Sequence, residues 1–178
     1  EPFFFYAAFT IPHAEMAVPE DSLKEYEGRW PEPKAFPGSK TYCPQEQPRA
    51  VRAAMISRLD RDVGRILDRL DELGIADNTL VMFSSDNGPI TAGGADPEFF
   101  DSNGPLRDLK FTLYEGGIRE PFSVRWPGRV AAGSVNELES DFADMMPTFA
   151  EVAGLPQPEG DGRSILPSLL GNAEKQQR

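Results

Sequence analysis

The sequence predicts an α/β fold in which strand-like apolar runs alternate with an amphipathic helix. The first observation is a continuous apolar run at residues 3–9, which is typical of an interior strand buried on both faces. The second is a set of apolar side chains spaced three or four apart over residues 51–73, which predicts a helix with one face on a core. The third is a β-branched and aromatic run at residues 79–85, which predicts a buried strand directly after that helix.

The bulk composition limits the classes of partner. A chain of 178 residues with 39% hydrophobic residues is long enough for one core, so we expect one domain or part of one. The 29 acidic and 18 basic residues give a net charge of -11, which argues against nucleic acid or an anionic membrane surface as the main partner. Residues 3–11 are too short for a membrane span and lack a basic leader, so we expect no membrane partner and no targeting segment.

The N-terminal third combines the predicted strand with a long excursion. An interior strand needs neighbours on both sides, so a start at Glu1 predicts that further sequence precedes this chain. On the same grounds we expect the isolated chain to self-associate through exposed strand edges. Residues 19–48 contain six prolines and no sustained period, which predicts a surface excursion with little regular structure.

The middle of the chain predicts one helix followed by one strand. The helical pattern covers residues 49–73, and Gly74 is placed as its C-terminal stop. Paired charges along the helix, such as Arg58 with Asp62, are expected to form a solvated face. Residues 75–78 then link the helix to the strand at 79–85.

The C-terminal half predicts shorter elements separated by loops. Residues 88–117 are rich in Gly, Pro and Asp around a less polar stretch at 106–113, which is typical of loops at the lip of a functional site. Residues 121–126 predict a second strand. A short helix is predicted from Asp144 to a stop at Gly154, and residues 164–170 predict a last turn or two of helix.

Two hard oxygen donors stand at the end of the predicted strand. Asp86 and Asn87 follow residues 79–85 and precede Gly88. Open α/β sheets bind ligands at the carboxyl ends of their strands, and a carboxylate with an amide carbonyl suits Ca2+ or Mg2+. The alternative is an ordinary turn, because Asp, Asn and Gly also satisfy turn backbone for structural reasons.

Cys43 and His13 are the single residues of their kinds in the chain. They lie in separate segments, so Cys43 lacks the nearby histidine expected of a cysteine nucleophile and is interpreted as incidental. One cysteine also excludes an internal disulfide and leaves the redox compartment open.

Several short segments, read in order, resemble the sulfatase family. The match is specific because the segments span nearly the whole chain in the family's own order. They are AFTIPH at 8–13, LDELG at 70–74 with NTLV at 78–81, SSDNG at 84–88, LYEGGIREP at 113–121, RWPG at 125–128 and DGRS at 161–164. The resemblance implies an alkaline-phosphatase-like fold with a mixed sheet between helices, of which residues 1–178 would be one part of a single catalytic domain, central to C-terminal.

The resemblance also implies roles for four residues. Asp86 and Asn87 match two ligands of the calcium ion that holds the sulfate oxygens, with Mg2+ as an alternative cation. Lys110 matches the lysine that reaches the sulfate group, where an ammonium can stabilise charge on a sulfuryl or leaving oxygen. His13 matches the histidine that contacts the sulfate and can protonate the leaving alcohol, because an imidazole can exchange a proton near neutral pH.

The nucleophile implied by the resemblance is a formylglycine made from Cys or Ser in Cys/Ser-x-Pro-x-Arg. We expect it upstream of Glu1, together with a further pair of aspartate ligands, because Cys43 is followed directly by Pro44 and does not fit that motif. Two ligands from this chain fall short of the six to eight oxygens usual for Ca2+. The chain alone is therefore expected to be inactive and to bind calcium weakly.

The segment around Lys110 departs from the family pattern, in which glycines flank the lysine. Asp108 and Leu109 precede it here and Phe111 follows, so we expect a bulkier lip or a differently directed lysine.

The sequence is compatible with three functional hypotheses. A sulfatase acting on an aryl or carbohydrate sulfate ester leads. A phosphohydrolase or phosphotransferase of the same superfamily is disfavoured by the single histidine, since its two-metal sites use several. A non-catalytic relative would have kept the fold and lost the chemistry. Substrate identity depends on loops such as 19–48 and 90–105, and the family alone suggests a periplasmic, lysosomal or secreted location.

Overall fold

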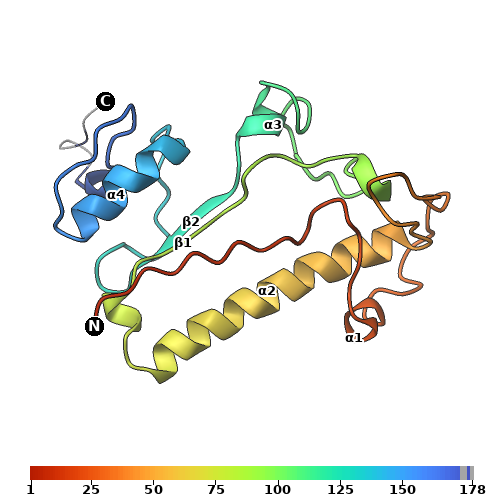
Figure 1. Cartoon of the computed structure of the whole chain (residues 1–178), viewed down its shortest axis with the longest axis horizontal. Coiled ribbons are helices and arrows are strands. Elements are labelled where there is room, and N and C mark those ends of the chain that lie inside the picture. The colour runs from red at the N-terminus through yellow and green to blue at the C-terminus, as the bar shows by residue number, and fades with distance from the viewer. Residues whose placement is uncertain (173–175, 177–178) are drawn as a thin grey trace. The chain divides into compact units, whose positions relative to one another are not determined.

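The computed structural model, drawn in Figure 1, describes residues 1–172 and 176. The chain divides into two compact units. The first unit contains residues 1–69 and 84–121, and the second contains residues 70–83 and 122–178. His13, Asp86, Asn87 and Lys110 all belong to the first unit. The geometry that relates these four residues is therefore contained in one body.

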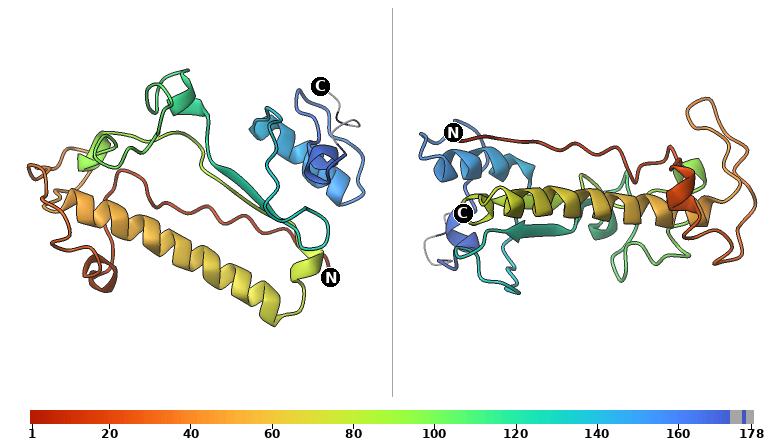
Figure 2. Two further views of the ribbon diagram at one scale, coloured as in Figure 1. Left: turned by 180° about the vertical axis from the view of Figure 1, so that it is seen from behind. Right: turned by 90° about the horizontal axis from the view of Figure 1, so that it is seen from below.

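The first unit is built on one long helix, of which residues 48–69 belong to this unit. Helix α2 (Pro48–Glu72) begins with proline, which is well suited to the first helical position, and Figure 2 shows it as a single uninterrupted helix. Gly74 follows with φ 66°, the left-handed conformation that commonly ends a helix. The helix and its glycine stop confirm the sequence prediction. The unit also contains α1 (Glu20–Leu23), α3 (Glu115–Ile118) and the 3-10 helix η2 (Ala92–Gly94).

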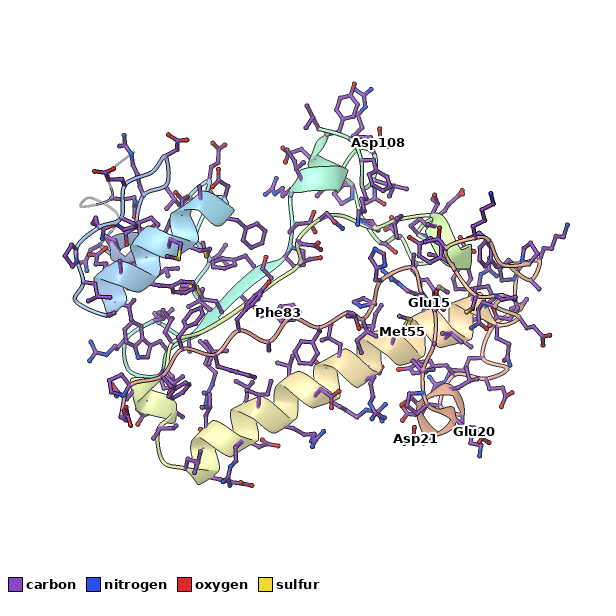
Figure 3. The ribbon with its side chains drawn as sticks, viewed as in Figure 1. Glu15, Glu20, Asp21, Met55, Phe83 and Asp108 are labelled. Carbon is purple, nitrogen blue, oxygen red and sulfur yellow. The ribbon has the colours of Figure 1, made fainter. Side chains whose placement is uncertain are left out.

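A small apolar core joins α2 to the segment that carries His13. Met16, Val51 and Met55 are buried together, and Ile11 and Ala95 pack against them. In Figure 3 the labelled Met55 of α2 faces the segment that carries Glu15. The core thus fixes residues on either side of His13 against a rigid helix.

Residues 96–100 are anchored on the first turn of α2. The Arg49 guanidinium lies 2.8 Å from a carboxylate oxygen of Asp96 and 3.8 Å from the centroid of the Phe99 ring. Trp30 contacts both Phe99 and Phe100 edge to face. The excursion at 19–48, which has only the short α1 as helix, therefore packs against the loop that follows Asp86 and Asn87. We call these two residues the metal corner.

The predicted interior strand at residues 3–9 is wrong for this chain. The segment has no strand assignment and is an extended trace in Figure 1. Its aromatic side chains are largely exposed, with Phe5 at 66% and Tyr6 at 80%. A strand requires a hydrogen-bonded neighbour, and the described part of the chain forms a single sheet that holds only β1 and β2.

The second unit contains that two-stranded sheet and the C-terminal helices. Strands β1 (Val81–Ser84) and β2 (Phe122–Arg125) confirm the predicted strands in shortened form, with Ser84 assigned to the first unit. The prediction that the strand at 79–85 is buried is wrong, since β1 is only partly buried and Phe83 is 38% exposed.

The remaining elements of the second unit are a 3-10 helix and two α-helices. A capping box formed by Asp141 and Asp144 starts η3 (Phe142–Asp144), which leads into α4 (Met145–Val152). The buried Thr148 of α4 accepts a hydrogen bond from the backbone of Ile165, just before α5 (Leu166–Leu169). Both C-terminal helices were expected from the sequence.

No helix among the described residues is long and apolar enough to cross a membrane.

Candidate functional site

Asp86 and Asn87 lie two and three residues beyond the end of β1. The Asp86 side chain is exposed, and its carboxylate accepts no hydrogen bond within the described part of the chain. The Asn87 side-chain nitrogen donates to the carbonyl of Gly88 at 3.1 Å, which leaves the amide oxygen as the available donor atom for a cation. A structural turn accounts for the Asn87 nitrogen, and the Asp86 carboxylate is open to solvent or to a cation.

Glu120 lies beside this corner and was missed by the sequence analysis. Its Oε1 is buried and has no hydrogen-bond partner among the described residues. Burial raises the pKa of the Glu120 carboxyl, and the negative charge of Asp86 raises it further. The sequence did not single out Glu120, because it is one of many acidic residues and directly follows Arg119.

The donors at this corner fit a hard divalent cation in type but not in number. Carboxylate and amide oxygens are what Ca2+ and Mg2+ prefer. Within residues 1–172 and 176, no group of three His, Cys, Asp or Glu side chains could hold a metal ion. A calcium site built on Asp86 and Asn87 therefore needs oxygen donors other than the side chains of these described residues.

Backbone hydrogen bonds join the metal corner to the loop at residues 106–117, which carries Lys110 and is called the lysine loop below. The Lys110 nitrogen donates to the Pro89 carbonyl at 2.9 Å, and the Gly88 nitrogen donates to the Gly117 carbonyl at 3.1 Å. Because both bonds are between main-chain atoms, the spacing of the two segments does not depend on side-chain rotamers. The structure thus brings Asp86, Asn87 and Lys110 onto adjoining loops.

Three glycines permit this close approach. A Cβ atom on Gly88 would lie 1.9 Å from the Gly116 carbonyl oxygen, and one on Gly116 would lie 1.9 Å from the Asp108 carbonyl oxygen. A Cβ on Gly117 would lie 2.7 Å from the Leu109 carbonyl oxygen. These backbone atoms cannot move aside cheaply, so only glycine fits at the three positions.

The residues that replace the expected glycines keep a glycine-like backbone. Asp108 and Phe111 have φ values of 69° and 78°. Aspartate tolerates this region, whereas an aromatic residue there is strained. Figure 3 labels Asp108 on the loop beside α3. The ring of Phe111 is 84% exposed, and its centroid lies 5.5 Å from the Lys110 ammonium nitrogen, so the lip beside the lysine carries a bulky side chain.

The His13 side chain is exposed. Its segment is connected to the other candidate residues through the loop that contains Gly93. Its imidazole centroid lies 6.2 Å from that of Tyr42, and its backbone nitrogen donates to Thr10 at 3.1 Å. Gly93, on the same loop as Asp86, packs so closely on Ala14 that an added Cβ would lie 1.9 Å from the Ala14 carbonyl oxygen. The loop that starts at the metal corner therefore touches both the lysine loop and the histidine segment.

Cys43 is exposed and unsuited to act as a thiolate. Glu15 raises the pKa of the Cys43 thiol, first by a side-chain hydrogen bond and then by its charge. This environment agrees with its interpretation as incidental.

The chain and its fold match known proteins. The family model described as "Sulfatase" matches residues 1–155, so the chain belongs to the sulfatase family. It is 42% identical over 118 residues to the human (Homo sapiens) N-acetylgalactosamine-6-sulfatase, an alignment that covers 65% of this chain and 22% of that protein. The chain therefore spans about a fifth of the length of this relative.

Solved structures agree on the fold. The crystal structure of Ps i-CgsB superposes with a TM-score of 0.77 at 30% identity, over 96% of this chain and 34% of that one. BT4656 in complex with its substrate D-glucosamine-2-N,6-O-disulfate gives a TM-score of 0.58 at 29% identity, over 71% and 24%. The phosphonate monoester hydrolase SpPMH from Silicibacter pomeroyi gives 0.56 at 30% identity, over 73% and 24%. The predicted α/β class is confirmed as part of a sulfatase-like fold.

Proposed function

We propose that this chain is the metal- and lysine-bearing part of a sulfatase catalytic domain that hydrolyses a sulfate ester. The observation that carries the proposal is the pair of backbone hydrogen bonds that holds the Asp86–Asn87 corner against the Lys110 loop. One similar protein is named an N-acetylgalactosamine-6-sulfatase, and BT4656 was solved with its substrate D-glucosamine-2-N,6-O-disulfate, which supports a carbohydrate or related small-molecule sulfate as the substrate class.

Each candidate residue has a chemical task in this proposal. Asp86 and Asn87 would hold the cation, with Glu120 adding negative charge nearby. A bound Ca2+ would supply positive charge that orients the sulfate oxygens. Lys110 would place an ammonium on a sulfuryl or leaving oxygen, and His13 would give a proton to the departing alcohol.

The nucleophile and the remaining ligands are proposed to lie elsewhere in the full-length gene product. The low coverage of the relatives supports this division. Sequencing the reading frame upstream of Glu1 tests it. A Cys/Ser-x-Pro-x-Arg motif with an earlier Asp-Asp pair supports a sulfatase, and a frame with neither contradicts the proposal.

Two substitutions in the full-length gene product separate the proposed roles. Asp86→Asn is expected to lower both bound calcium and turnover of 4-nitrophenyl sulfate, because one charged ligand is lost. Lys110→Met is expected to lower turnover at least about 100-fold while calcium remains bound. Calcium is measured by elemental analysis, and Asp77→Asn, an exposed carboxylate in the second unit, is the control. Full calcium occupancy in Asp86→Asn would refute the ligand role.

A phosphonate or phosphate ester hydrolase is the second candidate. The likeness to SpPMH favours it, since that protein is a phosphonate monoester hydrolase of similar fold. Turnover of 4-nitrophenyl phenylphosphonate compared with 4-nitrophenyl sulfate decides between the two. A non-catalytic relative, which the bulky Phe111 beside Lys110 would suit, would turn over neither ester.

A further inference from the structure

The segment that carries His13 is held by contacts on two sides. On one side, a guanidinium nitrogen of Arg52, on α2, donates a hydrogen bond to the carbonyl of Pro12. On the other side, Gly93 of η2 packs against the backbone of Ala14. The two contacts fall on the residues directly before and after His13.

The Arg52 side chain is set up for this contact. Its neighbours on α2, Val51 and Met55, are among the most buried residues of the chain, so the helix that carries it is firmly held. The guanidinium has no carboxylate within ion-pair distance among the described residues. Arg52 is half-buried, and this burial lowers the pKa of its guanidinium. A hydrogen bond from a charged, partly desolvated donor to a carbonyl is stronger than one between neutral groups.

Arg52 also connects the histidine segment to the metal corner. It lies beside Pro89, Ala95 and Asp96, on the loop that begins at Asp86, around a shallow depression of the surface. Arg52 therefore lies between the backbone that bears His13 and the residues just after the Asp86–Asn87 corner. A change at Arg52 would alter where the imidazole stands relative to that corner.

We propose that Arg52, assisted by Gly93, is a positioning residue that holds the backbone of His13 in place for proton transfer to the leaving alcohol. The proposal rests on the proposed function, in which His13 is the proton donor. General-acid assistance matters most when the departing alcohol is a poor leaving group. Misplacing the donor must therefore slow such esters more than activated ones.

The test compares two sulfate esters in the full-length gene product. Phenyl sulfate has the poorer leaving group, and 4-nitrophenyl sulfate the better one. Arg52→Met keeps the aliphatic stem of the side chain and removes its donors, so we expect it to lower kcat/KM about 10-fold more for phenyl sulfate than for 4-nitrophenyl sulfate. Arg52→Lys keeps one donor and is expected to recover part of the loss. Gly93→Ala is expected to give the same preference through the other contact.

Controls separate positioning from stability and from failure of the proposed function. Arg61→Met removes an exposed arginine of the same helix that pairs with Glu25, and it should leave both rates unchanged. His13→Ala should show the same leaving-group preference more strongly. If His13→Ala shows it and Arg52→Met lowers both rates equally, the positioning inference is overturned. If His13→Ala shows no preference, the proton-donor role in the proposed function fails first.

Discussion

Phe111 is the most strained residue of the lysine loop, because an aromatic side chain stands at φ 78°. Phe111→Gly is expected to raise the free energy of unfolding by about 1 kcal/mol, since glycine adopts this conformation without the Cβ clash. Denaturant unfolding of the full-length gene product measures the change. Phe111→Ala removes the ring but keeps the Cβ, so it should give no such gain. Equal gains in both variants would assign the effect to the exposed ring instead.

Glu120 is expected to support cation binding electrostatically. Its carboxyl lies near Asp86 and has a buried oxygen without a partner among the described residues, so a bound cation would offset an unfavourable charge. Glu120→Gln is expected to weaken calcium binding several-fold in titration calorimetry of the full-length gene product. Glu98→Gln removes an exposed carboxylate of the same unit and serves as the control. Unchanged affinity in Glu120→Gln would contradict this role.

At the scale of single residues, chemical type was predictable and environment was not. Asp86 and Asn87 are recognisable as hard donors because their residue types and their place after a strand are readable in the sequence. Arg52 and Glu120 gave no such signal. Their significance depends on burial and on neighbours distant in sequence, which no local pattern encodes.

The glycines between the metal corner and the lysine loop set the geometry of two elements at once. Gly116→Ala would place a Cβ 1.9 Å from the Asp108 carbonyl oxygen, so one of the two backbones must shift. We expect a loss of about 2 kcal/mol in the free energy of unfolding, measured by denaturant titration of the full-length gene product.

The control for Gly116→Ala is the same substitution in open space. An added Cβ on Gly64 of α2 meets nothing within 4 Å, and Gly64→Ala should stabilise the helix by about 0.5–1 kcal/mol. A Gly116→Ala variant as stable as the natural protein would show that the two loops can separate without cost.

Elements that are stabilised locally were predictable, and those that need distant partners were not. Helix α2 and its stop at Gly74 follow from periodicity and a glycine, both readable within the segment itself. The run at 3–9 has the composition of an interior strand, yet composition cannot supply the neighbouring strand that the ladder requires.

For the molecule as a whole, we expect the isolated 178-residue chain to self-associate. Phe5 and Tyr6 are 66% and 80% exposed on an extended segment, which is a template for intermolecular pairing. Light scattering over a concentration series should show oligomers. The double substitution Phe5→Lys with Tyr6→Lys should shift them toward monomer, whereas Val135→Lys, at a residue that is 89% exposed outside this segment, should not. A monomer at all concentrations would refute the expectation.

The hydrogen bond from the Lys110 nitrogen to the Pro89 carbonyl also closes a ring of chain, because residues 90–109 leave and return at points 2.9 Å apart. Lengthening a closed loop costs little, since the entropy of closure grows only with the logarithm of its length. We therefore expect insertions at residues 101–105 to be tolerated, because this part of the ring lies between the residues that hold it in place: Gly93 and Asp96 on one side and Asp108 on the other. Changes to this part of the loop could alter substrate preference while Asp86, Asn87 and Lys110 keep their mutual placement.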